Sequence, residues 1–452
     1  MGTWYVDATN GRDRNSGRSP AKAWKTLRRA RRQALHAGDA LLLRRGDSWA
    51  ESLRLRGSGR PGRPITVAAY GSGPRPRLAP RGVTVVENEG PVSWWRLARL
   101  ELCGAEPWAP FAREGGRAAG IAIHQASPSE GLSIEDCVVH DVSGPGIAFH
   151  AGASDGTVFR GWTVTGCEVY HAATGITAGG PWPPGPNPWQ YHEKFAVRDC
   201  RVHDIATDGI VLSHCRDGVI ERCTAYRSGI GRTRRTPVGI WFFQALRCVI
   251  RLSESFDNHT AGGKADGGGF DLDGGAVDCA MLDNYSHDND GAGYLVCSYD
   301  PVNAPCTGCL TRGNVSVNDG RANDYGAILF WQAHHCRTER NLCLTRISPG
   351  LKFTSETHGN VFADNTFVVD ARSDVAVLKS SFPVDANTFR GNRWWRTGGR
   401  PRFELPGHRR LDLGGYAKLT DAKGERATNP GWEDRLGREL RRLEVARRAS
   451  VG

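Results

Sequence analysis

Short runs in which apolar and polar residues alternate recur along most of the chain. One series opens on glycine and places apolar residues at every second position, as in Gly239-Ile240-Trp241-Phe242 and Gly350-Leu351-Lys352-Phe353. Strict alternation predicts a short β-strand with one buried face. Because the same run returns in successive segments, the pattern predicts one strand repeated many times.

A second repeated position carries Cys, Ser or Asn after an apolar residue and two polar ones. Its members, spaced 23 to 33 residues apart, are Cys137, Cys167, Cys200, Cys223, Ser253, Asn284, Asn314, Asn341, Asn365 and Asn392. A further short strand follows each of them. Strands that return once per turn predict a parallel β-helix of about ten or more rungs, with like residues stacked ~4.8 Å apart. Stacked Asn amides can then hydrogen-bond to one another as an internal ladder.

The two ends of such a coil need covers, because an open end exposes strand edges and core. Apolar spacing predicts an amphipathic helix near 23–35 and another near 433–447. We therefore expect an N-terminal cap helix and first rungs over 1–100, the β-helix with an acidic groove over 101–396, and a C-terminal tail and capping helix over 397–452. These segments would form one continuous structural domain.

The N-terminal motifs resemble a known family. Trp4-Tyr5-Val6-Asp7 with Asn10-Gly11, Trp24-Lys25-Thr26-Leu27 and Gly38-Asp39-Ala40 are similar to the opening of right-handed parallel β-helix proteins of the pectate-lyase-like superfamily. The resemblance implies an all-β, right-handed parallel β-helix with N- and C-terminal helical caps. It also implies a carbohydrate-active protein, since members include polysaccharide lyases, glycoside hydrolases and epimerases.

Charge is divided unevenly along the chain. The formal net charge of +11 combines +13 in residues 1–100, −9 in residues 101–390 and +7 in residues 391–452. The central repeats are acidic, so we expect no nucleic-acid partner.

The chain contains no run of about 18 apolar residues, so we expect no membrane-spanning helix. No export signal precedes Trp4, so the chain as written predicts a cytoplasmic protein, or a secreted one if a native signal peptide was removed. We expect a monomer.

Aspartates gather in one segment of the acidic region. Eight Asp residues lie between Asp257 and Asp290, and two of them, Asp271 and Asp273, fall on the outward face of one predicted strand. Two like charges about 7 Å apart beside apolar neighbours should perturb each other's pKa. Asp290 would lie about one rung, ~5 Å, from Asp271. We predict Asp271, Asp273 and Asp290 as catalytic residues.

Other outward positions suit a sugar chain. Aromatic side chains provide flat surfaces for sugar rings, and Lys352 could bind a sugar carboxylate three rungs from Asp271. The predicted substrate-binding residues are Trp241, Phe243, Trp331, Lys352 and, in a Pro- and Trp-rich loop, Trp182 and Trp189. Together they predict an elongated groove for a poly- or oligosaccharide.

Two mechanisms fit the acidic strand. A glycoside hydrolase needs one carboxylic acid and one carboxylate and no cofactor, and this is the reaction we favour. A calcium-dependent polysaccharide lyase is the first alternative, because the segments around Asp266, Asp288 and Lys352 resemble motifs of calcium-dependent pectate lyases. In that reading Asp266 and Asp288 are candidate Ca²⁺ ligands or secondary acidic residues. A non-catalytic glycan-binding repeat protein is the second alternative.

One pair of cysteines has the spacing of a zinc-binding site. Cys306 and Cys309 form a C-x-x-C pair, followed by Cys336. Cys309 and Cys336 also fall on a stacked series with Cys248 and Cys279, so no metal ligand is assigned with certainty.

Overall fold

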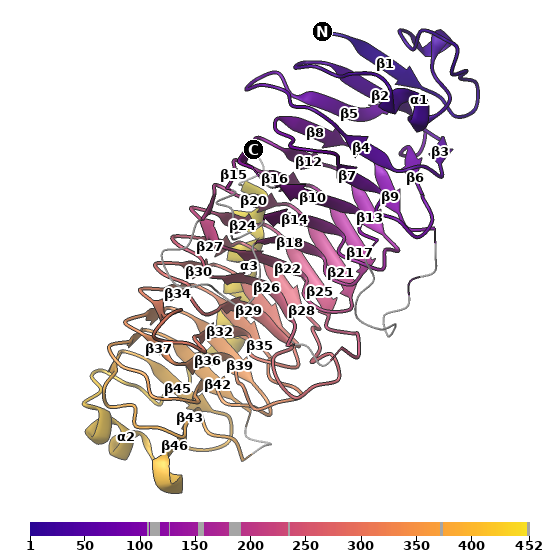
Figure 1. Cartoon of the computed structure of the whole chain (residues 1–452). Helices are drawn as coiled ribbons and strands as arrows, with labels where there is room; N and C mark the ends of the chain where they lie inside the picture. Colours follow the sequence, from indigo (N-terminus) through magenta and orange to yellow (C-terminus); the bar gives the residue numbers. More distant parts are fainter. Residues whose placement is uncertain are drawn as a thin grey trace. The chain divides into compact units, whose positions relative to one another are not determined.

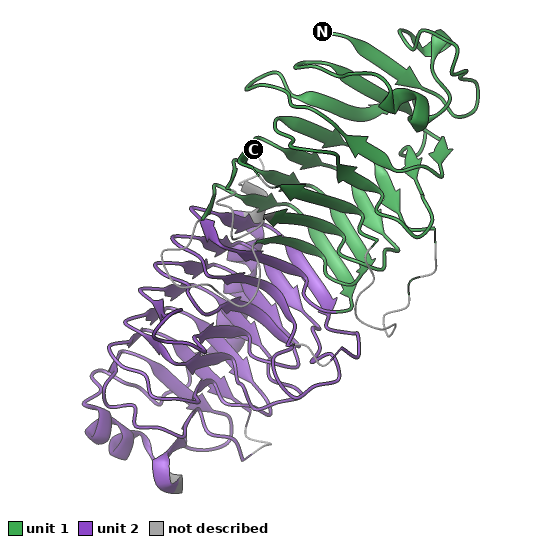
Figure 2. Cartoon of the chain, in the orientation of Figure 1, with its two compact units in different colours: residues 1–183, 188–206 green, residues 184–187, 207–452 purple. Residues whose placement is uncertain are grey.

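The computed structural model describes residues 1–105, 108, 118–125, 127–151, 158–179, 191–233, 236–370 and 374–449. The chain divides into two compact units, residues 1–183 with 188–206 and residues 184–187 with 207–452 (Figure 2). Both are stretches of parallel β-solenoid, which confirms the predicted β-helix. The expected domain limits at residues 100 and 396 stay a prediction.

Unit 1 stacks its strands in three long parallel sheets and one short one (Figure 1). The first sheet contains β1 (Thr3–Val6), β2 (Ala40–Arg44), β5 (Ile65–Tyr70), β8 (Trp95–Ala98), β12 (Ser133–Glu135), β16 (Thr163–Thr165) and β20 (Ala196–Arg198). The second contains β4 (Leu53–Leu55), β7 (Val86–Asn88), β10 (Ile121–Gln125), β14 (Ile147–Ala151) and β18 (Ile176–Gly179). The third contains β3 (Ser48–Trp49), β6 (Arg77–Leu78), β9 (Glu101–Cys103), β13 (Val138–His140), β17 (Glu168–Ala172) and β21 (Arg201–Ile205). The short sheet contains β11 (Ser129–Glu130), β15 (Phe159–Arg160) and β19 (His192–Glu193).

Unit 2 repeats the same three-sheet turn. Its first sheet contains β24 (Val219–Glu221), β27 (Val249–Arg251), β30 (Ala280–Leu282), β34 (Leu310–Arg312), β38 (Arg337–Glu339), β41 (Val361–Ala363) and β44 (Thr388–Arg390). The second contains β22 (Ile210–Ser213), β26 (Val238–Phe243), β29 (Gly268–Leu272), β32 (Tyr294–Cys297), β36 (Ile328–Trp331), β40 (Leu351–Phe353), β43 (Leu378–Ser380), β46 (Phe403–Leu405) and the antiparallel β47 (Arg409–Leu411). The third contains β25 (Thr224–Ser228), β28 (Glu254–Phe256), β31 (Tyr285–His287), β35 (Val315–Val317), β39 (Leu342–Thr345), β42 (Thr366–Val369) and β45 (Arg393–Arg396). Three two-residue strands, β23 (Cys215–Arg216), β33 (Cys306–Thr307) and β37 (Ala333–His334), lie in the turns.

The predicted asparagine ladder is present inside unit 2. Asn284 donates its backbone N–H and its Nδ2 to Oδ1 of Asn314 at 2.9 and 3.1 Å. Asn314 does the same to Asn341 at 3.0 Å in both bonds. Each amide is buried, so the bonds satisfy donors and acceptors that water cannot reach. The ladder therefore fixes where one strand ends and the next begins on every rung.

The N-terminal helix is shorter than its sequence pattern predicts. The structure has a 3₁₀ turn, η1 (Pro20–Lys22), and a single-turn helix, α1 (Leu27–Arg31), so the expected helix over 23–35 is wrong in its extent. Trp24 is extended because it pairs with Val6, and its backbone N–H donates to Tyr5 O. Thr26 then caps α1 by accepting from the backbone N–H of Arg29 at 3.0 Å. Pairing to the first strand thus outweighs helical periodicity here.

At the C-terminus, α3 (Trp432–Ala449) confirms the predicted helix near 433–447. It lies along the third sheet of unit 2, where Arg435 bonds to Thr366 and Arg442 pairs with Asp283 (Figure 1). The last rung is covered instead by η2 (Pro406–His408) and α2 (Leu413–Thr420), whose Tyr416 ring stacks on Phe403 at 4.1 Å. No helix in the described ranges is both long and apolar enough to cross a bilayer.

Candidate active site

Asp271 occupies an outward position in the middle of the second sheet of unit 2. On β29 it pairs in register with Trp241 of β26 and Leu295 of β32, while its neighbours Phe270 and Leu272 point into the core. Figure 1 shows these strands as consecutive rungs. The outward orientation agrees with the alternation in the sequence.

Loops cover this outward face. Leu295, Cys297 and Leu329 form a buried apolar cluster, and the Tyr325 ring packs against it. The Tyr299 ring lies so close to Gly274 that a Cβ there would approach it to 2.7 Å. Asp271 is consequently only 3% exposed. A surface strand of the repeat has become a semi-enclosed acidic site.

The surroundings of the Asp271 carboxyl group disfavour its charged form. Its Oδ1 is buried and has no hydrogen-bond partner. Burial raises its pKa well above the usual value, and the nearby carboxylates of Asp273, Asp266 and Asp208 raise it further. These surroundings favour the protonated form of the carboxyl.

Asp273 has two hydrogen-bond donors that favour its ionised form. Burial raises its pKa, but Oδ1 accepts hydrogen bonds from Gly274 N at 2.6 Å and Cys297 Sγ at 2.8 Å, which oppose the rise. Donors aimed at one oxygen stabilise the charged form. Asp271 on β29 and Asp273 directly after it thus differ in their hydrogen bonding, because the donors that oppose the rise in pKa belong to Asp273.

Asp266 precedes β29 in the turn that leads into it. Burial, followed by the charge of Asp273, raises its pKa to about 7, while a hydrogen bond from Thr236 works in the opposite direction. A carboxyl with this pKa can hold a proton near neutral pH and release it. Sequence analysis placed Asp266 only among the secondary acidic residues.

Asp290 belongs to a different set of contacts. Its carboxylate lies 3.2 Å from His259 Nδ1 and 3.3 Å from Arg321 Nη2, and despite burial these two groups lower its pKa. It is not among the charges that raise the pKa of Asp271.

Asp288 also has partners of its own. It is held by His287 at 3.0 Å and Asn318 at 2.6 Å, and its pKa is lowered despite burial. Asp288 and Asp290 both sit in the turn before β32, in ion pairs and hydrogen bonds of their own.

The predicted aromatic residues differ in exposure. Trp331 is 40% exposed and lies beside Cys297, on the same outward column as Asp273. Trp241 is partly buried and donates Nε1–H to Asp208 Oδ1 at 3.1 Å. Phe243 is buried between the rings of Trp241 and Tyr299. Trp182 and Trp189 lie outside the described residues.

Lys352 stands three rungs from Asp271, as the register of β32, β36 and β40 requires. Its ammonium pairs with Asp324, which also binds Lys379 at 2.6 Å, and it lies 5.6 Å from the Tyr325 ring centre. Burial lowers its pKa, and the Asp324 carboxylate opposes that change. The lysine is therefore part of a small charged cluster at ~14 Å from Asp271.

Sequence reasoning missed several members of the site. They are Cys297, Asp208 and the loop residues Tyr299, Asp324 and Tyr325. Asp208 carries a usable signal, since it stands directly before the glycine that opens an outward strand, as Asp266 does. The loop residues carry no such signal, because the repeat does not extend to them.

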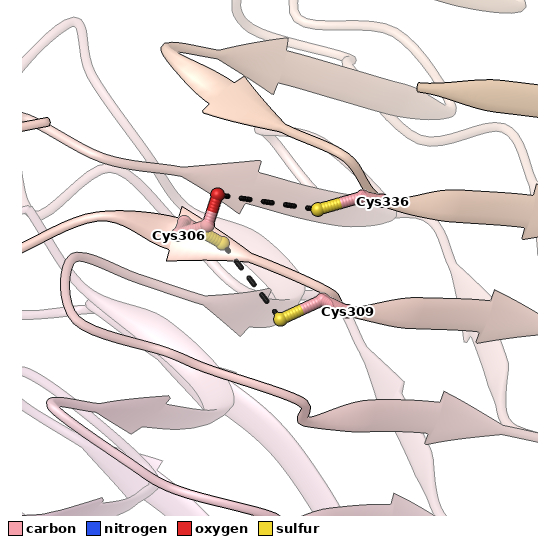
Figure 3. A group of neighbouring side chains, drawn as sticks. All are labelled: Cys306, Cys309 and Cys336. Atoms are coloured by element: carbon pink, nitrogen blue, oxygen red, sulfur yellow. Dashed lines mark hydrogen bonds between the residues drawn. The ribbon is translucent and has the colours of Figure 1, made fainter. Parts of the chain in front are cut away.

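The three cysteines of the possible zinc site do come together (Figure 3). The sulfurs of Cys306, Cys309 and Cys336 lie within 4.8 Å of one another, and all three residues are buried. Each sulfur also faces a backbone carbonyl, at 3.5 Å for Cys306 and 3.3 Å for the other two. Carbonyl oxygens accept hydrogen bonds from thiols, so these contacts fit a stack of cysteines that donate to the backbone.

Calcium ligands were expected around Asp266 and Asp288. In the described part of the chain, no three carboxylates bring ligand oxygens within 4.8 Å of one another. Ca²⁺ also accepts oxygens from carbonyl groups and water, so Asp266 and Asp288 stay predicted ligands.

No protein-family model matches the chain. A curated alpha-1,3-galactosidase A from Akkermansia muciniphila is 38% identical over 64 residues, which are 14% of this chain and 11% of the galactosidase. The chain thus spans about a tenth of the length of the curated relative it matches.

Solved structures resemble the chain over much more of its length. A GH136 lacto-N-biosidase from Eubacterium ramulus superposes with a TM-score of 0.58 and 17% identity, covering 94% of this chain and 67% of the biosidase. A rhamnogalacturonan lyase gives 0.52 and 15% identity, covering 74% and 87%. An alginate lyase from a Paenibacillus species gives 0.51 and 16% identity, covering 68% and 94%. These likenesses show the fold, a parallel β-helix shared with hydrolases and lyases.

Proposed function

We propose that this protein is a glycoside hydrolase that acts on a poly- or oligosaccharide. The observation that carries the proposal is the cluster of three carboxyls, Asp266, Asp271 and Asp273, whose pKa values are raised to different extents. Carboxyls whose pKa values are pushed apart are the mark of an acid and base pair. The β-helix neighbours named as a biosidase and the short match to a galactosidase support a carbohydrate substrate.

Each carboxyl has a defined role in the proposal. Asp273 acts as the ionised base or nucleophile, and Asp266, with its pKa of about 7, gives a proton to the leaving glycosidic oxygen. The glycosidic C–O bond breaks, water supplies the hydroxyl group at the new reducing end, and its remaining proton restores the acid. Asp271, neutral and covered, completes the group behind them. Exposed Trp331 offers a surface for a sugar ring.

The test is a panel of polysaccharides and oligosaccharides assayed for new reducing ends and for ultraviolet-absorbing unsaturated products, with and without EDTA. We expect reducing ends alone, insensitive to EDTA. Asp266→Asn and Asp273→Asn should each lower turnover at least 100-fold while circular dichroism stays unchanged.

Asp217→Asn is the matched control, because Asp217 pairs with Arg247 on the surface of the same unit. Full turnover in Asp266→Asn and Asp273→Asn would overturn the proposal. A loss in Asp271→Asn as deep as in Asp266→Asn would assign the acid role to Asp271. A comparable loss in Asp290→Asn would restore the grouping expected from the sequence.

One observation favours a lyase as the second candidate. Lys352 is largely buried beside Tyr325 and its pKa is lowered, which suits a base that abstracts a proton next to a uronate carboxylate. Unsaturated products that disappear in Lys352→Ala but persist in Asp273→Asn would establish β-elimination in place of hydrolysis. Binding without products of either kind, measured by calorimetry with the same panel, would indicate a glycan-binding protein.

A further inference from the structure

Arginines without acidic partners surround a cavity in unit 2, away from the acidic strand. The cavity has a volume of about 410 Å³ and lies between α3 and the turns that join the first and third sheets. Its charged lining consists of Arg340, Arg393, Arg426 and Arg435 together with Asp364 and Glu439. Four guanidinium groups thus face two carboxylates.

Arg435 shows how incompletely this charge is neutralised. It is partly buried, and its Nη1 donates to Thr366 Oγ1 at 2.7 Å, a neutral acceptor. Burial lowers its pKa, and the positive charges of Arg393 and Arg438 lower it further, against the attraction of Glu439. A guanidinium held between like charges without an ion pair costs folding free energy.

Arg442, two turns further along the same helix, has the opposite environment. It pairs with Asp283 and Glu439, both at 2.7 Å, and these partners raise its pKa. Because Glu439 is engaged there, it leaves Arg435 without a direct counter-ion. Among the residues that the structure describes, Arg340, Arg393 and Arg426 also have no carboxylate oxygen within 4.0 Å of their guanidinium nitrogens.

We propose that this cavity binds a tetrahedral oxyanion, the sulfate or phosphate group of a small ligand. Guanidinium groups present planar pairs of N–H donors that match the oxygens of such groups, and converging arginines are the usual way to hold them. A water molecule occupies ~30 Å³, so the cavity has room for the oxyanion and for a sugar ring attached to it. Binding would supply the counter-charge that Arg435 lacks.

The experiment measures thermal unfolding and calorimetric binding of the full chain at constant ionic strength. The probes are inorganic sulfate, inorganic phosphate, galactose 6-sulfate and glucose 6-phosphate, with sodium chloride as the reference. We expect millimolar or tighter binding of at least one probe and a rise in Tm. Tighter binding of the sugar esters than of the inorganic ions identifies an ester ligand, and the reverse identifies a free ion.

The variant Arg393→Gln/Arg435→Gln should weaken that binding at least tenfold. Without the anion it should melt no lower than the wild type, because it removes like-charge repulsion while Gln keeps a donor for Thr366. Arg441→Gln, on the same helix but outside the cavity lining, is the matched control and should bind as the wild type does. Equal binding by the double variant, or no response of the wild type beyond that in chloride, would overturn the proposal.

Discussion

The thiol of Cys297 lies 2.8 Å from Oδ1 of Asp273, one rung away in the same sheet. Its own pKa is raised well above the usual value, so it remains a donor throughout the physiological range. The bond opposes the rise that burial imposes on the pKa of Asp273. A single sulfur thereby contributes to the division of roles within the acidic group.

Removing this donor should shift the ionisation of Asp273. In Cys297→Ala the charged form loses one hydrogen bond, so the pKa of Asp273 should rise by about half to one unit. With an active substrate, the acidic limb of the kcat/KM profile should move to higher pH by that amount. Cys297→Ser keeps a donor and serves as the control. An acidic limb that stays in place in Cys297→Ala would show that Asp273 does not govern it.

Replacing Asp266 should stabilise the protein in a pH-dependent way. Its folded pKa of about 7 lies above the ordinary value of 3.8, so the unfolded chain loses the proton first as pH rises. Between about pH 4 and 7 the wild type therefore loses stability, and above pH 7 the penalty is complete. Asp266→Asn cannot ionise. We expect a gain in the free energy of unfolding of about 2–4 kcal/mol at pH 8, falling towards zero at pH 4.

Urea unfolding at pH 4, 6 and 8 measures this difference. Asp217→Asn should show no comparable growth of stability with pH, because Asp217 is a surface carboxylate paired with Arg247. A gain for Asp266→Asn that is equal at all three pH values would contradict the assignment of the raised pKa.

Interrupting the asparagine ladder should be costly. Asn314→Ala removes the acceptor of two bonds from Asn284 and the donors to Asn341 and Met281, all buried. Each buried group left without a partner costs about 1–3 kcal/mol, so we expect a loss of about 3–5 kcal/mol in urea unfolding. Asn314→Ser should lose less, since Ser253 fills the same ladder position, where its Oγ accepts from Cys223 N at 3.1 Å and donates to Arg251 O at 3.0 Å. Equal losses in both variants would mean that volume, and not hydrogen bonding, is what matters there.

Trp331 should contribute to substrate binding and little to folding. Its side chain is 40% exposed on the column of Asp273, so Trp331→Ala should raise KM or Kd for an active glycan about five- to fifty-fold, corresponding to roughly 1–2 kcal/mol. The Tm should change by no more than a degree or two. Phe243→Ala is the contrasting variant, because Phe243 is buried and its loss should lower the Tm by several degrees. Unchanged glycan binding in Trp331→Ala would remove this residue from the site.

The repeat made most of the fold predictable. Alternation around Ile240 and Phe242 identified the strands, and the Asn series identified the internal ladder, because each pattern is reinforced by many rungs. The length of the helix over 23–35 was overestimated, since the spacing of apolar residues does not show that Trp24 pairs with Val6. A non-local bridge of this kind leaves no trace in a local window.

The site was predictable only as far as the repeat extends. The outward direction of Asp271 follows from strand alternation, but its burial does not, because Tyr299 and Tyr325 pack over neighbouring residues from loops of irregular length. Counting rungs brought Asp290 near Asp271. The count of rungs does not show that His259 and Arg321 hold the Asp290 carboxylate in separate ion pairs.

The ladder has a consequence for how such a protein can change. Successive ladder residues are separated by between 23 and 33 positions, yet the strands that flank them remain in register. Additions and deletions are therefore absorbed in the turns without disturbing the interior. A loop that carries Tyr299 or Tyr325 could be exchanged for one of another length while the aspartates keep their scaffold, so new specificities can be grafted onto an unchanged frame.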